Sequence, residues 1–288
     1  MSGRRALVIA GLTLREMVRR RVLWVLVALV VASVVLVGWG TERLVTLARE
    51  EGVEGLQVRI GVSQILILVA FMFSFVVATS AAFLAAPAIA SDVETGTVHA
   101  LLARPLRRAE LVIGRWLGLS VVVGLYAALS ALLAIGVVAL VSGHVPHEPM
   151  TAVGFLTAQA IAVLTLALAF GTRLPAMAAG AITVVVFGIG WFMGVLGNLA
   201  VVFEAPSVQQ AADTVRILIP TDGLWRGVIY GLEPPILLLL AAGRNVDALA
   251  ANPFYAPTPP PVAFVAWSIV WILLVLLAAI ALFRRREL

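Results

Sequence analysis

Six long segments of this sequence contain no Asp, Glu, Lys or Arg, and they constrain the fold more than any other feature. They run over 22–41, 60–91, 116–147, 149–172, 174–203 and 248–283. A helix rises about 1.5 Å per residue, so about 20 apolar residues cross the hydrocarbon core of a bilayer, and each segment is long enough. Because 62% of the residues are apolar and only 12% are charged, a soluble core cannot hold them all and the excess must face lipid. The sequence therefore predicts an all-α polytopic membrane protein.

The predicted architecture is a single transmembrane domain over residues 1–288 with six transmembrane helices. The expected spans are 22–41, 62–90, 116–142, 151–170, 175–202 and 262–283. Arginine sets the orientation: the termini and the loops on their side carry 14 Arg and five acidic residues, and the other loops carry six Arg and ten acidic residues. By the positive-inside rule, both termini are expected in the cytoplasm and the chain in the inner (cytoplasmic) membrane. The Arg clusters are then topology signals, and no nucleic acid partner is expected.

The N-terminal segment 3–20 has the pattern of an amphipathic helix that lies along the membrane surface. Its expected apolar face consists of Leu7, Ala10, Leu14, Met17 and Val18, with most of the arginines opposite. Such a helix serves either as a simple anchor or as a contact for a partner protein.

The fifth expected span and the segment after it carry packing and loop signals. Gly190 and Gly194 form a small-xxx-small pair, which predicts close helix packing, with a flexible point for gating as the alternative. Residues 204–261 are expected to form a large external loop. Within this loop, the short apolar piece 235–242 is predicted as an interfacial or re-entrant segment, or as part of a small cap.

The sequence lacks the residue patterns that catalysis or metal binding would need. There is no cysteine, which excludes disulfides and Cys-ligated metals. His144 and His147 precede Glu148 in a short turn, where two solvated histidines are the simpler interpretation than a metal site. No zinc-protease, Gly-x-Ser-x-Gly or phosphate-binding P-loop motif is present. The chain is expected to be non-catalytic, with no catalytic and no metal residues, so energy for any work would come from another subunit.

One stretch, 91–115, is unlike the apolar segments around it and has the pattern of a helix, a break and a second helix. Gly96 can turn the backbone out of the preceding helix, and Thr97 is a suitable N-cap for a short helix through residue 103. Pro105 disfavours helix at Arg104 and ends this element. Residues 106–115 then restart as a helix that leads into the third span.

The same stretch resembles the signature of permease subunits of ABC-2 type ABC transporters. The pattern is Asp92-x-Glu94-x-Gly96-Thr97, then Leu101-Leu102-x-Arg104-Pro105, then Arg108-x-Glu110-Leu111 and Gly114-Arg115. Arg115 stands where the family usually has Lys, which is consistent with a chain that contains no lysine. The motif covers about 25 residues, and the six-span layout extends the resemblance loosely to the whole chain.

The resemblance implies that a short cytoplasmic coupling helix rests on a separate P-loop ATPase subunit and that a second permease, identical or different, completes the pathway. ATP and Mg would be bound by the ATPase, so this chain needs no cofactor of its own. The residues expected to contact the ATPase are Asp92, Glu94, Thr95, Gly96, Thr97, Leu101, Leu102, Arg104, Pro105, Arg107, Arg108 and Glu110. The alternative for this stretch is a topogenic loop that faces lipid.

The leading hypothesis is a permease subunit that moves a substrate across the inner membrane with ATP hydrolysed by its partner. A secondary transporter is the first alternative, but the near-absence of charged residues in the spans argues against ion coupling. A membrane scaffold without ATPase coupling is the second alternative. An intramembrane enzyme is disfavoured by the missing nucleophile, base and metal patterns. The substrate and the direction of transport do not follow from the sequence.

Overall fold

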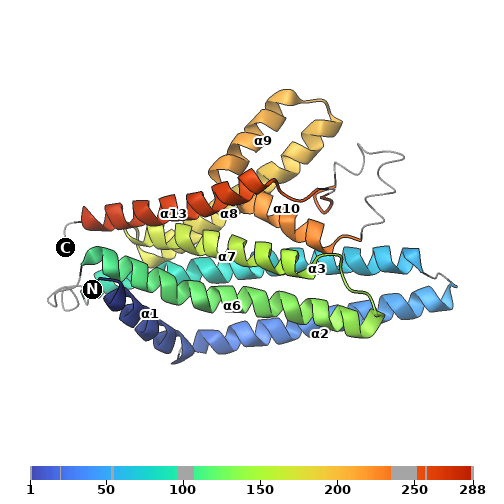
Figure 1. Cartoon of the computed structure of the whole chain (residues 1–288), viewed down its shortest axis with the longest axis horizontal. Helices are drawn as coiled ribbons and strands as arrows, with labels where there is room; N and C mark the ends of the chain where they lie inside the picture. The colour runs from blue at the N-terminus through green and yellow to red at the C-terminus, as the bar shows by residue number, and fades with distance from the viewer. Residues whose placement is uncertain are drawn as a thin grey trace.

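The structure is a computed structural model that describes residues 2–19, 21–52, 55–96, 107–234, 252–256 and 258–286. The regular elements in these ranges are all α-helices: α1 (Ser2–Arg19), α2 (Arg21–Glu50), α3 (Leu56–Ala85), α4 (Pro87–Glu94), α6 (Arg108–Ser142), α7 (Pro149–Gly171), α8 (Ala176–Val202), α9 (Pro206–Leu218), α10 (Thr221–Leu232) and α13 (Val262–Arg284). They form an elongated bundle with both chain ends at the same end (Figure 1). We call this the inner end and the opposite one the outer end.

Six helical segments are long and apolar enough to cross a membrane. They are Leu26–Glu50, Gln57–Glu94, Arg108–Ser142, Pro149–Gly171, Ala176–Val202 and Val262–Arg284. The prediction of an all-α polytopic membrane protein with six spans is therefore confirmed. Large apolar side chains such as Leu140 and Trp24 are mostly exposed on these helices, as expected for surfaces that contact lipid.

The first two spans are longer than the apolar pattern indicated. α2 continues to Glu50, past the expected end at 41, and α3 begins at Leu56, before the expected start at 62. The added turns contain charged residues, so they extend the helices beyond the apolar part of the span. α3 and α4 form one span, interrupted where Pro87, which has no N–H, begins α4.

The N-terminal helix α1 packs against the first turns of α6 instead of lying on the membrane surface alone. Its buried residues are Ala6, Ile9, Ala10, Thr13 and Met17. Glycines in α6 permit this approach, because a Cβ at Gly114 would lie 2.6 Å from the Ile9 Cβ and a Cβ at Gly118 would lie 2.8 Å from the Ala10 carbonyl oxygen. Leu7 of the expected apolar face is 66% exposed, as are the apolar side chains of surfaces that contact lipid. Small residues make the close contact, and the larger side chain points away from it.

The segment expected to be a large external loop, 204–261, contains two helices, α9 and α10. α9 doubles back along α8, and a Cβ at Gly197 of α8 would lie 2.8 Å from the Ala212 Cβ of α9. Figure 1 shows this pair of helices leaning away from the bundle. The apolar piece 235–242 lies outside the described residues.

α10 lies inside the outer half of the bundle, against α7. Its first residue, Thr221, accepts a hydrogen bond from Gln159, which is midway along α7, and the Gly231 carbonyl accepts one from the Glu148 N–H, just before α7 begins. Ten of its twelve residues are buried. α9 and α10 together therefore form a re-entrant hairpin whose turn reaches the middle of the bundle. Its sequence signal is the spacing Gly223-x-x-x-Gly227-x-x-x-Gly231, which places three close-approach positions on one helix face.

Candidate functional site

A single arginine ties three helices together at the inner end. Arg115 of α6 donates from Nη1 to Glu16 Oε2 of α1 at 2.7 Å and from Nη2 to Asp92 Oδ2 of α4 at 2.9 Å. The Arg115 side chain is 15% exposed, so these charge-assisted bonds are partly shielded from water. The Gly-Arg ending of the predicted signature is therefore an internal bridge between the N-terminal helix and the end of α4.

The start of α6 is held by a buried carboxylate. Glu110 accepts a hydrogen bond from the Arg107 backbone N–H at 2.9 Å, and Arg5 of α1 lies 3.9 Å from the same oxygen. A carboxylate in the first turn satisfies a free N–H group and complements the helix dipole. The predicted restart of the helix before the third span is thus present, with its first residue at Arg108.

Arg108 of α6 binds the C-terminal end of α13. Its Nη1 atom donates to the carbonyl oxygens of Phe283, Arg284 and Arg286, at 3.2, 3.0 and 2.6 Å. These carbonyls belong to the last turn of α13 and the residues after it, which have no partners within the helix. Arg286 in turn donates to the Thr172 carbonyl at 2.6 Å, next to the end of α7.

Glu94 connects the end of α4 to the start of α8. Its Oε1 atom accepts the Ala176 N–H at 3.0 Å, which caps a free donor at the N-terminus of α8. Two residues later Gly96 has φ +72°, a left-handed conformation that costs glycine little and ends the helical path of α4. The helical path of α4 therefore ends at Gly96, and the next described residue is Arg107.

The residues expected to contact an ATPase divide into three groups. Asp92, Glu94, Arg108 and Glu110 bond within the chain and join helices at the inner end. Thr95, Gly96 and Arg107 are exposed on either side of the gap in the described chain. The others, Thr97, Leu101, Leu102, Arg104 and Pro105, lie outside the described residues, as does the expected short helix.

The turn of the α9–α10 hairpin carries a charged cluster that sequence analysis missed. Asp222 Oδ2 accepts hydrogen bonds from Arg216 Nε at 3.0 Å and from Arg226 Nε at 3.4 Å. Arg216 Nη1 also reaches Asp213 at 2.8 Å, and Arg226 Nη2 donates to Asn198 Oδ1 of α8. The Arg226 guanidinium carries a permanent charge, and the Asp222 carboxylate beside it neutralises part of that charge. The spacing of Asp222 and Arg226, four residues apart, is the available sequence signal, but both residues fall within the expected external loop.

The glycine pair of α8 packs against this cluster. A Cβ at Gly190 would lie 2.8 Å from Thr221 Oγ1, and a Cβ at Gly194 would overlap the Asp222 carboxylate. Both glycines therefore face the start of α10.

A second buried polar group holds the tip of the hairpin. Gln159 of α7 accepts a hydrogen bond from the Ser74 hydroxyl of α3 at 2.8 Å and donates to the Thr221 carbonyl at 3.1 Å. The Gln159 side chain joins three helices and is 3% exposed. Its amide therefore satisfies two polar groups that would otherwise be unpaired in the core.

Glu233, just past α10, is a buried carboxyl group at the outer end. It is 2% exposed, and its Oε1 atom accepts the Ala256 N–H at 3.2 Å. Burial raises its pKa to about 7, and the hydrogen bond from Ala256 opposes the shift. Burial and the nearby Glu233 charge also raise the pKa of Tyr255.

The histidines of the outer turn do not meet each other. His144 Nε2 lies 3.0 Å from the Ser63 hydroxyl of α3, and burial together with the charge of Arg59 lowers its pKa. His147 is exposed. Among the described residues, no group of three or more His, Asp or Glu side chains is placed to hold a metal ion.

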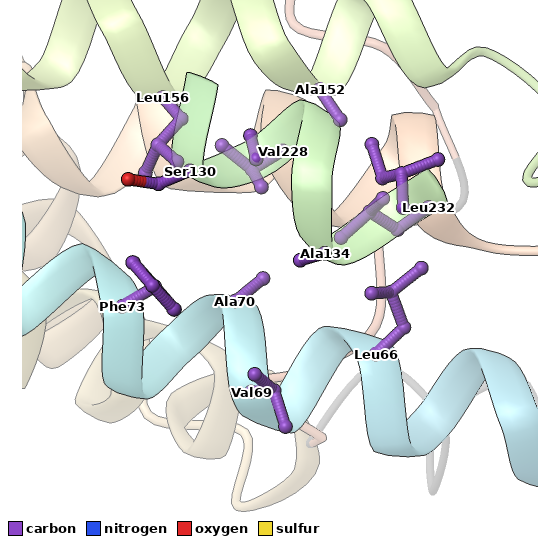
Figure 2. Close-up of a pocket in the computed structure, with 12 residues that line it drawn as sticks. Leu66, Val69, Ala70, Phe73, Ser130, Ala134, Ala152, Leu156, Val228 and Leu232 are labelled. Atoms are coloured by element: carbon purple, nitrogen blue, oxygen red, sulfur yellow. The ribbon is translucent and has the colours of Figure 1, made fainter. Parts of the chain in front are cut away.

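A small apolar cavity lies between α3, α6, α7 and α10. Leu66, Phe73, Leu156 and Val228 are among the side chains around it, and Ser130 supplies the one polar atom in view (Figure 2). The Ser130 hydroxyl donates to the Tyr126 carbonyl, so it is not free to bind a ligand. The cavity holds about 20 Å³, enough for about one water molecule. It is a packing gap, too small for a transported substrate.

The sequence comparisons agree with this architecture. A family model described as ABC-2 family transporter protein matches residues 7–288, which include all six spans. A search of curated proteins found no significant match. Because the family model covers nearly the whole sequence, the chain belongs to the ABC-2 family of transporter proteins.

Proposed function

We propose that this chain is the membrane-spanning permease subunit of an ABC transporter and that a separate P-loop ATPase drives it. The chain supplies the spans and the docking surface, carries no catalytic site, and binds no cofactor. The ATPase binds ATP and Mg and rests on the inner end, at the 97–106 segment and the exposed residues beside it. Family membership supports transport as the general function.

The bonding of the inner end is the observation that carries the coupling proposal. The 97–106 segment joins α4 to α6, and both of these helices are bonded to others at that point. Glu94 links α4 to α8, Arg115 links α6 to α1 and α4, and Arg108 links α6 to the end of α13. A force applied to this segment would therefore reach at least five helices through short, charge-assisted bonds.

Transport is proposed to need a second permease, identical or different, and membership of the ABC-2 family supports this pairing. Both termini are placed in the cytoplasm on the positive-inside rule, and the membrane is the inner membrane. The chain has no cysteine, so single cysteines report the topology cleanly. In spheroplasts, Glu51→Cys should react with a membrane-impermeant maleimide, and Arg107→Cys should react only after permeabilisation. The reverse pattern would contradict this orientation.

The coupling proposal is tested by co-expressing the chain with P-loop ATPases of its own genome, beginning with any encoded beside it. Co-purification and ATP turnover are measured for the wild type and for the Leu101→Ala/Leu102→Ala variant. If these leucines fill a groove on the ATPase, both readouts should fall about tenfold or more.

Leu47→Ala is the matched control, because Leu47 is an equally apolar side chain that is 57% exposed at the outer end. It should leave both readouts unchanged. Full co-purification and turnover in the Leu101→Ala/Leu102→Ala variant would disprove the docking site. Transport that proceeds without any ATPase would favour a secondary transporter.

A further inference from the structure

A pocket of about 380 Å³ opens between α10 and the segment that leads into α13. Its lining comes from the hairpin on one side and from the proline-rich segment and the first turn of α13 on the other. Its charged, polar and apolar side chains include those of Arg216, Arg226, Thr258, Pro260 and Phe264. This pocket is separate from the inner end, where the ATPase is proposed to dock.

The lining contains two guanidinium groups and no carboxylate among the described residues. Asp222, which bonds to both arginines through their Nε atoms, is 7% exposed and does not line the pocket. Asp213, the other acidic partner, is 56% exposed. The shielded part of the cluster therefore has two positive charges and one negative charge, an excess that favours an anion.

Each arginine also has a donor group to spare. Arg216 uses Nε and Nη1, and Arg226 uses Nε and Nη2, in the bonds to acidic and amide side chains. Arg216 Nη2 and Arg226 Nη1 have no hydrogen-bond partner among the described residues, and neither atom is fully buried. Asp222 thus fixes two guanidinium groups while leaving a terminal N–H group of each available. This is the donor arrangement that recognises a tetrahedral oxyanion.

The position of the pocket along the bundle indicates where the anion comes from. The apolar run of α13 begins at Val262, which is 85% exposed, directly after the prolines of the lining. Trp267, one turn further in, donates to the Ile217 carbonyl of α9 at 2.8 Å, and tryptophans of this kind are common at the membrane boundary. The pocket therefore lies where the apolar run of α13 begins, outward of the hairpin turn that meets the middle of α7. The Phe264 ring, which packs on Gly223, forms an apolar wall of the pocket.

We infer that this pocket binds the phosphate of an anionic phospholipid in the outer leaflet, with Arg216 and Arg226 as donors to the phosphate oxygens. The inference is independent of the proposed ATPase coupling. A bound lipid would join the re-entrant hairpin to α13 at the outer end.

The test uses the purified full chain in a non-ionic detergent and follows the binding of short-chain phosphatidylglycerol by native mass spectrometry. The Arg216→Gln/Arg226→Gln variant should bind this lipid about tenfold more weakly, since it loses two charge-assisted contacts. Arg49→Gln is the matched control, because Arg49 is an exposed arginine at the same end of the molecule, and it should bind like the wild type.

Removing both arginines leaves Asp222 buried and unpaired, which could destabilise the fold. Two further variants therefore test the site without removing both charges of the pair. Arg216→Lys/Arg226→Lys keeps the charges but gives each residue a single amine, which stays with Asp222, and should also weaken binding. Asp222→Asn removes the neutralising charge and should tighten binding. Each variant is first checked by size-exclusion chromatography and circular dichroism. Equal lipid affinity in the wild type and a folded arginine variant would overturn the site.

The source of the phosphate is tested separately. Inorganic phosphate is titrated into the lipid-free protein, and the zwitterionic phosphatidylcholine of the same chain length is titrated in parallel. The proposal expects phosphatidylglycerol to bind at least tenfold more tightly than either one. If inorganic phosphate binds as tightly as the lipid, the pocket is a free-anion site and the lipid assignment is wrong. If phosphatidylcholine binds equally well, the anionic headgroup is not what the arginines recognise.

Discussion

The two ends of the molecule are held together by different kinds of interaction. At the inner end, helix termini are joined by arginines and carboxylates: Arg115 bonds to Glu16 and Asp92, and Arg108 covers the last carbonyls of α13. At the outer end, the α9–α10 hairpin packs on glycines of α8, and the Asp222 carboxylate and the Gln159 amide are buried.

The bonds at the two ends also differ in how far they are exposed to solvent. The inner-end bonds are partly exposed, with 15–39% of the Arg115, Asp92 and Glu16 side chains accessible, so each is screened and each can yield without loss of the fold. Glycines permit close packing at both ends, at Gly114 and Gly118 of α6 as well as at Gly194 beneath the hairpin, but the carboxylate in contact with Gly194 is only 7% exposed. We therefore expect the inner end to transmit movement and the outer end to act as a rigid body.

The largest effect should come from filling the space beneath the hairpin. Gly194→Val places a side chain on the Asp222 carboxylate and should cost about 3 kcal/mol or more, because it both overpacks the core and disrupts a buried ion cluster. The measurement is equilibrium unfolding in mixed micelles. Gly188→Val on the same helix is the control, since its added Cβ meets nothing within 4 Å. Equal destabilisation by the two substitutions would show that the outer end is not tightly packed.

Glu233 should make the outer end sensitive to pH. Its pKa is about 7 in the folded protein against 4.5 for a free glutamate. The carboxyl group therefore stays protonated to a higher pH in the folded state than in the unfolded state. The resulting stability is complete below pH 4.5 and is lost as the pH rises through about 7, by at most about 3 kcal/mol. Unfolding measured from pH 4.5 to 8 should show this loss in the wild type and not in Glu233→Gln. An identical pH profile for both would place the titration elsewhere.

Loss of the inner bridge should have a smaller effect on stability. Arg115→Gln removes the partner of two carboxylates, and since these are partly solvated the expected cost is about 2 kcal/mol. Arg15→Gln, a change at an exposed arginine of α1, is the control. Arg115→Lys should recover part of the loss, because one amine can still reach one carboxylate. A variant as stable as the control would mean that the bridge contributes nothing.

The smallest effect is expected at the tip of the hairpin. Gln159→Leu keeps the size of the side chain but leaves the Ser74 hydroxyl and the Thr221 carbonyl unpaired, which should cost about 1 kcal/mol. Hydrogen exchange should rise in α10 and remain unchanged in α1. Unchanged exchange in α10 would show that Gln159 does not hold the hairpin in place.

Sequence reasoning succeeded where the signal is local and strong. The six spans, the break at Gly96 and the restart of the helix near Arg108 each follow from a run of residues or a single backbone preference. It failed for α9 and α10, because short helices that contain Arg216, Asp222 and Arg226 do not look like membrane-embedded elements. It did not identify α6 as the partner of α1, since apolar periodicity does not distinguish a surface that packs on a helix from one that contacts lipid.

The family resemblance identified the 91–115 stretch, but it did not reveal that Asp92, Glu94, Arg108 and Glu110 bond within the chain. Sequence alone cannot assign these bonds because their partners are remote: Arg108 reaches a carbonyl 175 residues away, and Glu94 reaches an N–H group 82 residues away. Whether these side chains also touch an ATPase stays a prediction.

By itself the sequence determined that this chain must lie in a membrane and cross it six times, because only lipid can accommodate such long runs without charge. The tertiary structure decided which of the few charged residues are shielded and paired. It brought Arg216, Asp222 and Arg226 together beside α8 and bridged α1, α4 and α6 through Arg115. The physical reason is that a charge shielded from water inside a helix bundle needs a partner, and the packing of the helices determines which partner is within reach.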